Sequence, residues 1–267
     1  MSSTITATAA PAGDQGQIRA RLHVLVRDHA NYKRWETRYR NALKLKRDDE
    51  EQKRPTPYLI TPEYKGRMEG LLAQSDAWTD EIVKEIAHLV HQLQIWTEWA
   101  IAVKPLGEIT IAYLEALVDL EKASDDQGRV TISKVWRFCG YGPAEDKGAF
   151  GKRKYCAPLK SQLYQWGMSL EKLGSQCESK YHAIMLGIKE RYANSDREVS
   201  ERSKINGAKM VAWKDARPGH RRNAAIRRAV KELLKDYVIA RTALEGRIVR
   251  PPYGEEYLGR KHEGSAT

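Results

Sequence analysis

A short segment that can bind phosphate lies near the middle of the chain, at residues 104–110. It reads Lys-Pro-Leu-Gly-Glu-Ile-Thr and turns through Gly107 into an apolar stretch. This pattern is typical of a helix-hairpin-helix, in which backbone amides at the start of the second helix point outward. Exposed amides and the positive end of a helix dipole bind phosphate without reading bases. The segment therefore indicates a nucleic-acid backbone as the first ligand to consider.

The charge of the chain is distributed unevenly. Lys and Arg number 46 against 35 Asp and Glu, a formal net charge of +11. Residues 1–120 hold 16 basic and 17 acidic side chains, a net of −1, whereas residues 121–267 hold 30 and 18, a net of +12. A field of this sign favours polyanions and gives salt-sensitive, largely non-specific binding. A solvated basic face without such a ligand is the alternative.

Two basic clusters follow the hairpin, one in a glycine-rich loop at residues 147–154 and one at the start of the last strong helix. Cations at a helix start oppose its positive dipole end, so an anionic partner would make this placement favourable. For the loop, a solubilising surface turn is the alternative. The predicted nucleic-acid-binding residues are Lys104, Gly107, Ile109, Lys147, Lys152, Arg153, Lys154, Arg221, Arg222, Arg227 and Arg228.

Two long helices are predicted before the hairpin. Apolar residues over 17–47 follow alternating steps of four and three, and so do those over 62–103. A proline-bearing loop separates the two stretches, and Thr61 caps the second with Pro62 at its first position. The helices are expected to form an antiparallel hairpin or to be arms that pair with a second copy. A homodimer through residues 17–103 is therefore one of two open alternatives.

The predicted fold class is all-α: a long helical coiled-coil hairpin followed by a helical domain that contains the helix-hairpin-helix. No stretch shows convincing strand alternation, and residues 199–213 are assigned an uncertain helix. A last helix at residues 221–244 is expected to bury one stripe. The predicted divisions are a disordered tail at 1–16, helical arms at 17–103, the hairpin-containing domain at 104–247 and a flexible tail at 248–267.

The order of these pieces resembles the C-terminal transposase domain of guide-RNA-directed insertion-sequence recombinases, which carry a DEDD resolvase-like nuclease domain at their N-terminus. A coiled coil, the hairpin, a helix ending in a Gly-x-x-Pro turn, a Gly-Lys-rich loop and a late Ala-rich helix follow one another over roughly residues 80–244. The best-matching residues are Leu106, Gly107, Ile109, Thr110, Gly140, Pro143, Gly151, Lys152, Leu163, Tyr164, Leu233 and Leu234. The resemblance implies a DNA-binding body related to the DNA recombination of a mobile element.

Both catalytic features of that family are unmatched here. The family's nuclease domain supplies an acidic tetrad that binds metal, whereas the region before the hairpin is charged helix without alternating strands. The family also has a catalytic serine shortly after the proline of the turn, and the corresponding position is Lys147. An ammonium cannot form the covalent bond to DNA that a serine hydroxyl would. We therefore expect no catalytic residue in this chain.

The leading hypothesis is a non-catalytic protein that binds DNA or structured RNA through the phosphate backbone. The alternative is a recombinase or transposase subunit whose nuclease half is supplied by a separate partner chain. A third is a structural adaptor whose coiled coil is the working part. No cofactor or metal is expected, because the acidic cluster at residues 119–126 is explained by a helix end followed by a turn.

Composition bears on the compartment. No apolar run approaches the roughly 20 residues of a membrane helix. The first residues lack a basic and apolar signal-peptide pattern, and the three cysteines lack a Cys-x-x-Cys spacing. These features predict a cytoplasmic protein that does not contact a membrane.

Overall fold

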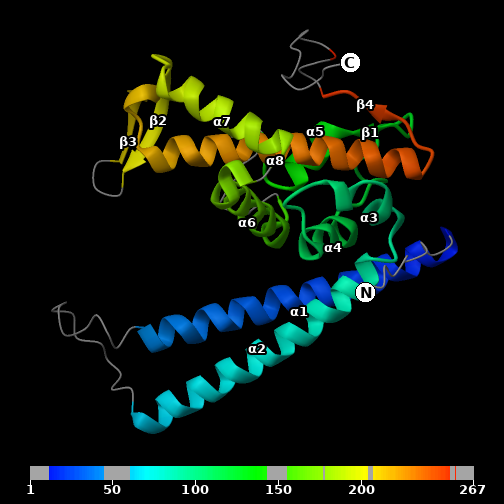
Figure 1. The fold of residues 1–267 in the computed structure, drawn as a ribbon, viewed down its shortest axis with the longest axis vertical. Helices are drawn as coiled ribbons and strands as arrows, with labels where there is room; N and C mark the ends of the chain where they lie inside the picture. The colour runs from blue at the N-terminus through cyan, green and yellow to red at the C-terminus, as the bar shows by residue number, and fades with distance from the viewer. Residues whose placement is uncertain are drawn as a thin grey trace. The chain divides into compact units, whose positions relative to one another are not determined.

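The computed structural model describes residues 12–44, 61–142, 155–176, 178–203, 207–252 and 256. The elements in chain order are α1 (Ala12–Lys44), α2 (Pro62–Val90), α3 (Gln94–Glu98), η1 (Ala100–Ala102), α4 (Glu108–Leu117), β1 (Val130–Thr131), α5 (Ile132–Phe138), α6 (Ala157–Leu173), η4 (Gly174–Gln176), α7 (Lys180–Ala193), β2 (Glu198–Ser203), β3 (Gly207–Ala212), η5 (Trp213–Asp215), α8 (Pro218–Leu244) and β4 (Val249–Arg250). Helices dominate the described chain (Figure 1), so the all-α prediction is confirmed.

The chain divides into two compact units. Unit 1 consists of residues 1–93 with residues 111–116, and unit 2 consists of residues 94–110 with residues 117–267. The hairpin predicted to bind phosphate lies in unit 2. The middle of α4, which follows that hairpin directly, groups with the long helices of unit 1.

In unit 1, α1 and α2 run side by side in opposite directions (Figure 1). Buried side chains recur along α1 at steps of three and four, as predicted, and include Ile18, Leu22 and Leu25. The predicted start of α2 is confirmed, because the Thr61 hydroxyl accepts a 3.2 Å hydrogen bond from the backbone amide of Tyr64. Pairing within one chain is thus present, and pairing with a second copy stays a prediction.

The polar position His29 in the predicted stripe of α1 has a partner within unit 1. Its Nδ1 lies 2.8 Å from the Tyr113 hydroxyl of α4. Burial, and then the nearby charge of Lys33, lower the pKa of His29 to about 4. Close by, Arg19 Nε donates to Glu115 Oε2 at 2.7 Å. The polar residue His29 is therefore satisfied by a side chain of α4.

The prediction of one helix over 62–103 is wrong. The structure ends α2 at Val90 and turns before the short helices α3 and η1. Leu93 and Ile95 are 0% and 1% exposed. Residues two apart point to nearly opposite sides of a helix, so burying both favours a bend at this point, although neither Gly nor Pro marks it.

In unit 2, α5, α6 and α7 pack against α8 (Figure 1). The predicted stripe of α8 is confirmed, since Ala225, Ala229 and Leu233 are fully buried. Gly167 of α6 allows a close crossing, because a Cβ at this position would overlap the side chain of Ile226. This packing fixes the faces that α6 and α8 present to the surface of unit 2.

The prediction of a helix at residues 199–213 is wrong, because this stretch forms an antiparallel hairpin of β2 and β3. The register pairs Val199 with Val211 and Glu201 with Lys209. Both strands are short and β2 is mostly polar, so their stability depends on cross-strand pairing that a local hydrophobic pattern does not reveal. A second small pair joins β1 to β4 in parallel, with Val130 opposite Val249.

Candidate nucleic-acid interface

The turn before α4 is exposed at Gly107 and anchored beside it. Leu106 is 6% exposed, and its amide donates to the Val103 carbonyl at 2.7 Å. The Thr110 amide returns to the Gly107 carbonyl at 3.1 Å. The first amides of a helix have no acceptor within that helix. The local geometry therefore suits the predicted phosphate contact.

A surface hollow of about 250 Å³ lies beside this turn, and we call it the Gly107 hollow. Its other wall is α6, from which Gln162 donates to Thr110 Oγ1 at 3.1 Å. Glu108 lines the hollow, and no Lys or Arg does so among the described residues. A carboxylate in the first turn of α4 already interacts favourably with the helix dipole, so it competes with a phosphate for this place.

The predicted binding residues fall into three groups. Lys104, Gly107 and Ile109 lie at or next to the turn before α4, with Lys104 exposed and Ile109 partly buried. The loop residues Lys147, Lys152, Arg153 and Lys154 lie outside the described residues. The four predicted arginines lie on the first turns of α8, as expected.

Most cations at the start of α8 have partners within unit 2. Arg222 lies 3.8 Å from Glu171 of α6, and Arg228 lies 3.3 Å from Glu232 one turn further on. Arg221 donates to the Lys214 carbonyl at 2.6 Å. These contacts offset part of the repulsion between the arginines and the dipole of α8. These in-chain contacts already stabilise the cations at this helix start, so an external anion is less necessary than the sequence suggested.

Arg227 differs from these neighbours. Its Nη2 donates to the carbonyl oxygens of Tyr141, at 3.2 Å, and Gly142. No carboxylate pairs with Arg227 among the described residues. Among the described residues, Arg227 is therefore the one predicted cation of α8 that lines a hollow and contacts only uncharged groups.

That hollow has a volume of about 420 Å³ and lies where the turn after α5 meets α6 and α8 of unit 2; we call it the Gly140 hollow. Its lining residues are Gly140, Tyr141, Tyr155, Ala157, Lys160, Ser161, Tyr164, Asn223, Ile226 and Arg227. Among the residues that the structure describes, this lining carries two cationic side chains and no carboxylate. Sequence analysis singled out Gly140, Tyr164 and Arg227 but missed Lys160 and Asn223, which α6 and α8 bring to the same place.

Gly140 is required where it stands. Its φ is +79°, and a Cβ there would lie 2.7 Å from Lys160 Cδ and 3.0 Å from the Tyr155 ring. The Lys160 ammonium in turn sits 4.3 Å from the centre of the Tyr155 ring. The glycine of the predicted Gly-x-x-Pro turn thus makes room for a cation and an aromatic ring at the wall of the hollow.

The end of unit 2 that contains β2, β3 and the start of α8 (Figure 1) is rich in basic residues. Residues 189–228 hold twelve Lys and Arg against five Asp and Glu, a net of +7. The rings of Tyr192, Trp213 and His220 stack in series, with centroids 4.1 Å and 5.1 Å apart. This stack joins the end of α7 to the start of α8. Lys209 and Met210 of β3, which precede Trp213 in the chain, are exposed.

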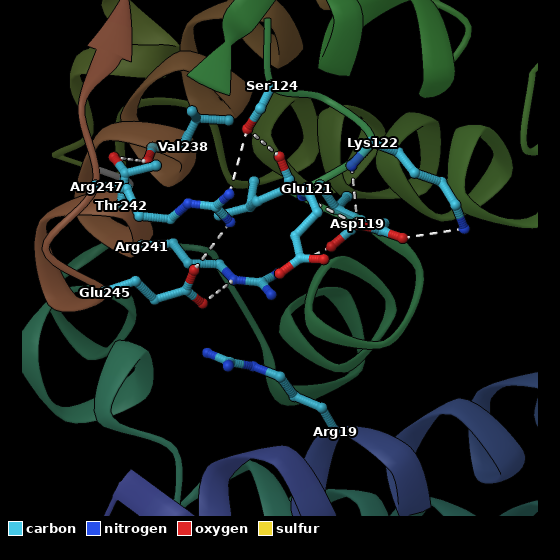
Figure 2. Close-up of polar contacts among 12 residues, drawn as sticks. Arg19, Asp119, Glu121, Lys122, Ser124, Val238, Arg241, Thr242, Glu245 and Arg247 are labelled. Carbon is cyan, nitrogen blue, oxygen red and sulfur yellow. Dashed lines mark hydrogen bonds and ion pairs between the residues drawn. The ribbon is translucent and has the colours of Figure 1, made fainter. Parts of the chain in front are cut away.

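The acidic cluster at residues 119–126 forms a structural turn, as the sequence favoured. Asp119 accepts from the amides of Glu121 and Lys122 at 3.0 and 3.1 Å, and the Lys122 amide and ammonium lower the pKa of the Asp119 carboxyl. Figure 2 shows this turn with Arg241, which pairs with Glu245 at 3.2 Å. Among the described residues, no three His, Cys, Asp or Glu side chains gather as a metal site.

Comparisons with family models, with curated proteins and with solved structures gave no match. The transposase resemblance therefore stays a prediction based on the residues quoted above. None of the helices that the structure describes is long and apolar enough to cross a membrane.

Proposed function

We propose that unit 2 binds the sugar–phosphate backbone of DNA or structured RNA and that this chain itself carries out no strand chemistry. The observation that carries the proposal is the basic end of unit 2, where residues 189–228 have a net charge of +7. Backbone binding needs such a cluster of cations and little base readout.

The exposed turn at Gly107 supports the same function in a secondary role. Its amides suit a phosphate, but Glu108 lines the adjoining hollow. We therefore assign the main affinity to the cations of α8, with Lys160 beside them, and a smaller part to the turn.

The experiment is a titration of fluorescently labelled duplex DNA and hairpin RNA with the full chain at two salt concentrations. We expect the logarithm of the association constant to fall linearly with the logarithm of the salt concentration, because each neutralised phosphate releases counterions. Absence of binding at low salt, or binding that does not change with salt, contradicts the proposal.

Catalysis is tested separately on supercoiled DNA with magnesium. The proposal expects no nicking or joining by this chain alone. Cleavage that the purified chain performs, and that a chelator abolishes, would favour the recombinase alternative instead. Activity that appears only on adding a separate nuclease chain would support a subunit that binds while its partner cuts.

The arms of unit 1 are proposed to pair with a second copy. Trp35 and Trp78 are 41% and 40% exposed, and both rings contact Tyr32, with centroids 5.3 Å apart in each case. Such exposed aromatic rings are common at protein interfaces. Sedimentation of the full chain should give a dimer that Trp35→Ala with Trp78→Ala converts to a monomer, and a wild-type monomer at high concentration contradicts pairing.

A further inference from the structure

The Gly140 hollow contains two cationic side chains that no carboxylate of the described residues neutralises. Arg222 and Arg228 lie within 4 Å of carboxylates, at 3.8 and 3.3 Å, whereas Lys160 and Arg227 pair with none among the described residues. Lys160 contacts an aromatic ring, and Arg227 contacts backbone carbonyls. Two cations that line one hollow without a counter-ion favour an anionic ligand.

We propose that the Gly140 hollow binds one nucleoside phosphate, with its phosphate on Lys160 and Arg227 and its base against the tyrosine rings. This inference rests on the proposed nucleic-acid-binding function and names the part of the nucleic acid that this site takes. The ligand is one nucleotide unit, supplied either by an unstacked position of a strand or as a free nucleotide.

The phosphate half of the site follows from the cations. An ammonium supplies three donors, and a guanidinium supplies five in a planar fork. The Arg227 fork uses Nη2 for the carbonyls of Tyr141 and Gly142, which orients the guanidinium at the wall of the hollow. Its remaining N–H groups and the Lys160 ammonium are the donors for a phosphate.

The base half follows from the aromatic and amide side chains. Tyr164 is 38% exposed, and its hydroxyl donates to Asn223 Oδ1 at 3.0 Å. That bond orients the Asn223 amide, whose NH₂ group can donate to a ring nitrogen or carbonyl of a base. Tyrosine rings stack on any base, and Ile226 supplies apolar wall beside them. The volume of about 420 Å³ lies within the range of small-ligand pockets.

The first experiment uses isothermal titration calorimetry with adenosine 5′-monophosphate and with inorganic phosphate as separate probes of the full chain. We expect the nucleotide to bind about tenfold more tightly than phosphate, because only the nucleotide stacks. Lys160→Ala should weaken both probes about tenfold. Tyr164→Ala should weaken only the nucleotide. Lys172→Ala, an exposed lysine on the same helix but outside the hollow, is the matched control and should change neither.

A second measurement distinguishes the two sources of the nucleotide. A single strand carrying 5-iodouracil should crosslink to Tyr164 on irradiation if its base leaves the stack and enters the hollow, and Tyr164→Ala should remove the crosslink. A nucleotide that binds in calorimetry while the strand shows no such crosslink assigns the hollow to free nucleotides.

The outcomes also separate this inference from the proposed function. If strands bind in a salt-dependent manner, but Lys160→Ala and Tyr164→Ala match Lys172→Ala with every probe, the nucleotide pocket is refuted and backbone binding stands. If no nucleic acid binds at low salt, the proposed function fails. Nucleotide binding sensitive to Lys160→Ala would then still support the pocket. Equal affinity for nucleotide and phosphate refutes the base half of the site.

Discussion

The Gly107 and Gly140 hollows lie on two faces of the same helix, α6, and differ in charge. Gln162 of α6 faces the first hollow and Lys160 faces the second. The Gly107 hollow has backbone geometry suited to phosphate but includes Glu108, whereas the Gly140 hollow, which Ala157 at the start of α6 also lines, carries two cations. A backbone motif suited to phosphate and the positive charge that binds a polyanion therefore need not lie at the same place. A motif alone therefore identifies only part of an interface.

The largest expected effect tests the cations of the Gly140 hollow. Lys160→Glu combined with Arg227→Glu should weaken the binding of a labelled single strand about 100-fold at low salt, since two attractive contacts become repulsive. The control, Lys172→Glu with Lys65→Glu, makes the same change in net charge at exposed positions outside both hollows. Equal losses in the two double variants would show that only total charge matters.

The second prediction compares one substitution in both hollows. Gly140→Ala should lower the free energy of unfolding by about 1–2 kcal/mol, because its φ is +79° and the new Cβ meets Lys160 and Tyr155. Gly107→Ala should change it by less than about 0.5 kcal/mol, since nothing lies within 4 Å of a Cβ there. Urea unfolding of both variants measures the difference. Equal costs would mean that Gly140 does not shape its hollow.

The third prediction measures how much the Gly107 hollow contributes. Glu108→Gln removes the carboxylate from the first turn of α4 and should tighten nucleic-acid binding about two- to threefold, if the start of α4 contacts a phosphate. Glu121→Gln removes an exposed carboxylate outside this hollow and serves as control. Fluorescence anisotropy with one labelled duplex decides the matter. Identical affinities for the two variants would remove the hairpin from the interface.

The smallest effect concerns Lys231, whose ammonium lies 4.5 Å from the centre of the Trp136 ring. Burial, and then the charges of Arg227 and Arg228, lower the pKa of Lys231 to about 8. Because the unfolded chain keeps this proton up to a higher pH, the free energy of unfolding should rise as pH increases from about 8 toward 10.5. Arg227→Ala should raise the pKa of Lys231 by a fraction of a unit, measured by NMR titration. Glu108→Gln should leave that pKa unchanged, and a shift in both variants contradicts the assignment.

Local rules predicted much of the helical framework. The Thr61 cap, the stripe of α1 and the stripe of α8 each depend on residues within a few turns of one another, so their spacing is visible in the sequence. The β2–β3 hairpin was missed because Val199 is the only apolar residue of β2, and β3 shows no regular alternation of apolar and polar residues. The bend after Val90 was missed because burial on both sides of it depends on the tertiary structure.

The candidate site was predictable only in part for the same reason. The glycine turn at Gly140 and the arginines of α8 are visible in the sequence. Lys160, in contrast, has no local pattern that distinguishes it from other surface lysines. Glu232 lies four residues after Arg228 on the same helix, so that pair is visible in the spacing. Glu171, which lies near Arg222, comes from α6 through packing, and the sequence could not show this contact.

The division of α4 between the two units has a consequence for any shortened version of this protein. Ile111 and Leu114 are fully buried in the structure, and the residues from 111 to 116 belong with the long helices of unit 1 while both ends of α4 belong with unit 2. Dividing the chain between the long helices and the hairpin would separate residues 111–116 of α4 from the helices of unit 1 with which they group. A shortened version that lacks residues 1–93 should therefore expose Ile111 and Leu114 to solvent.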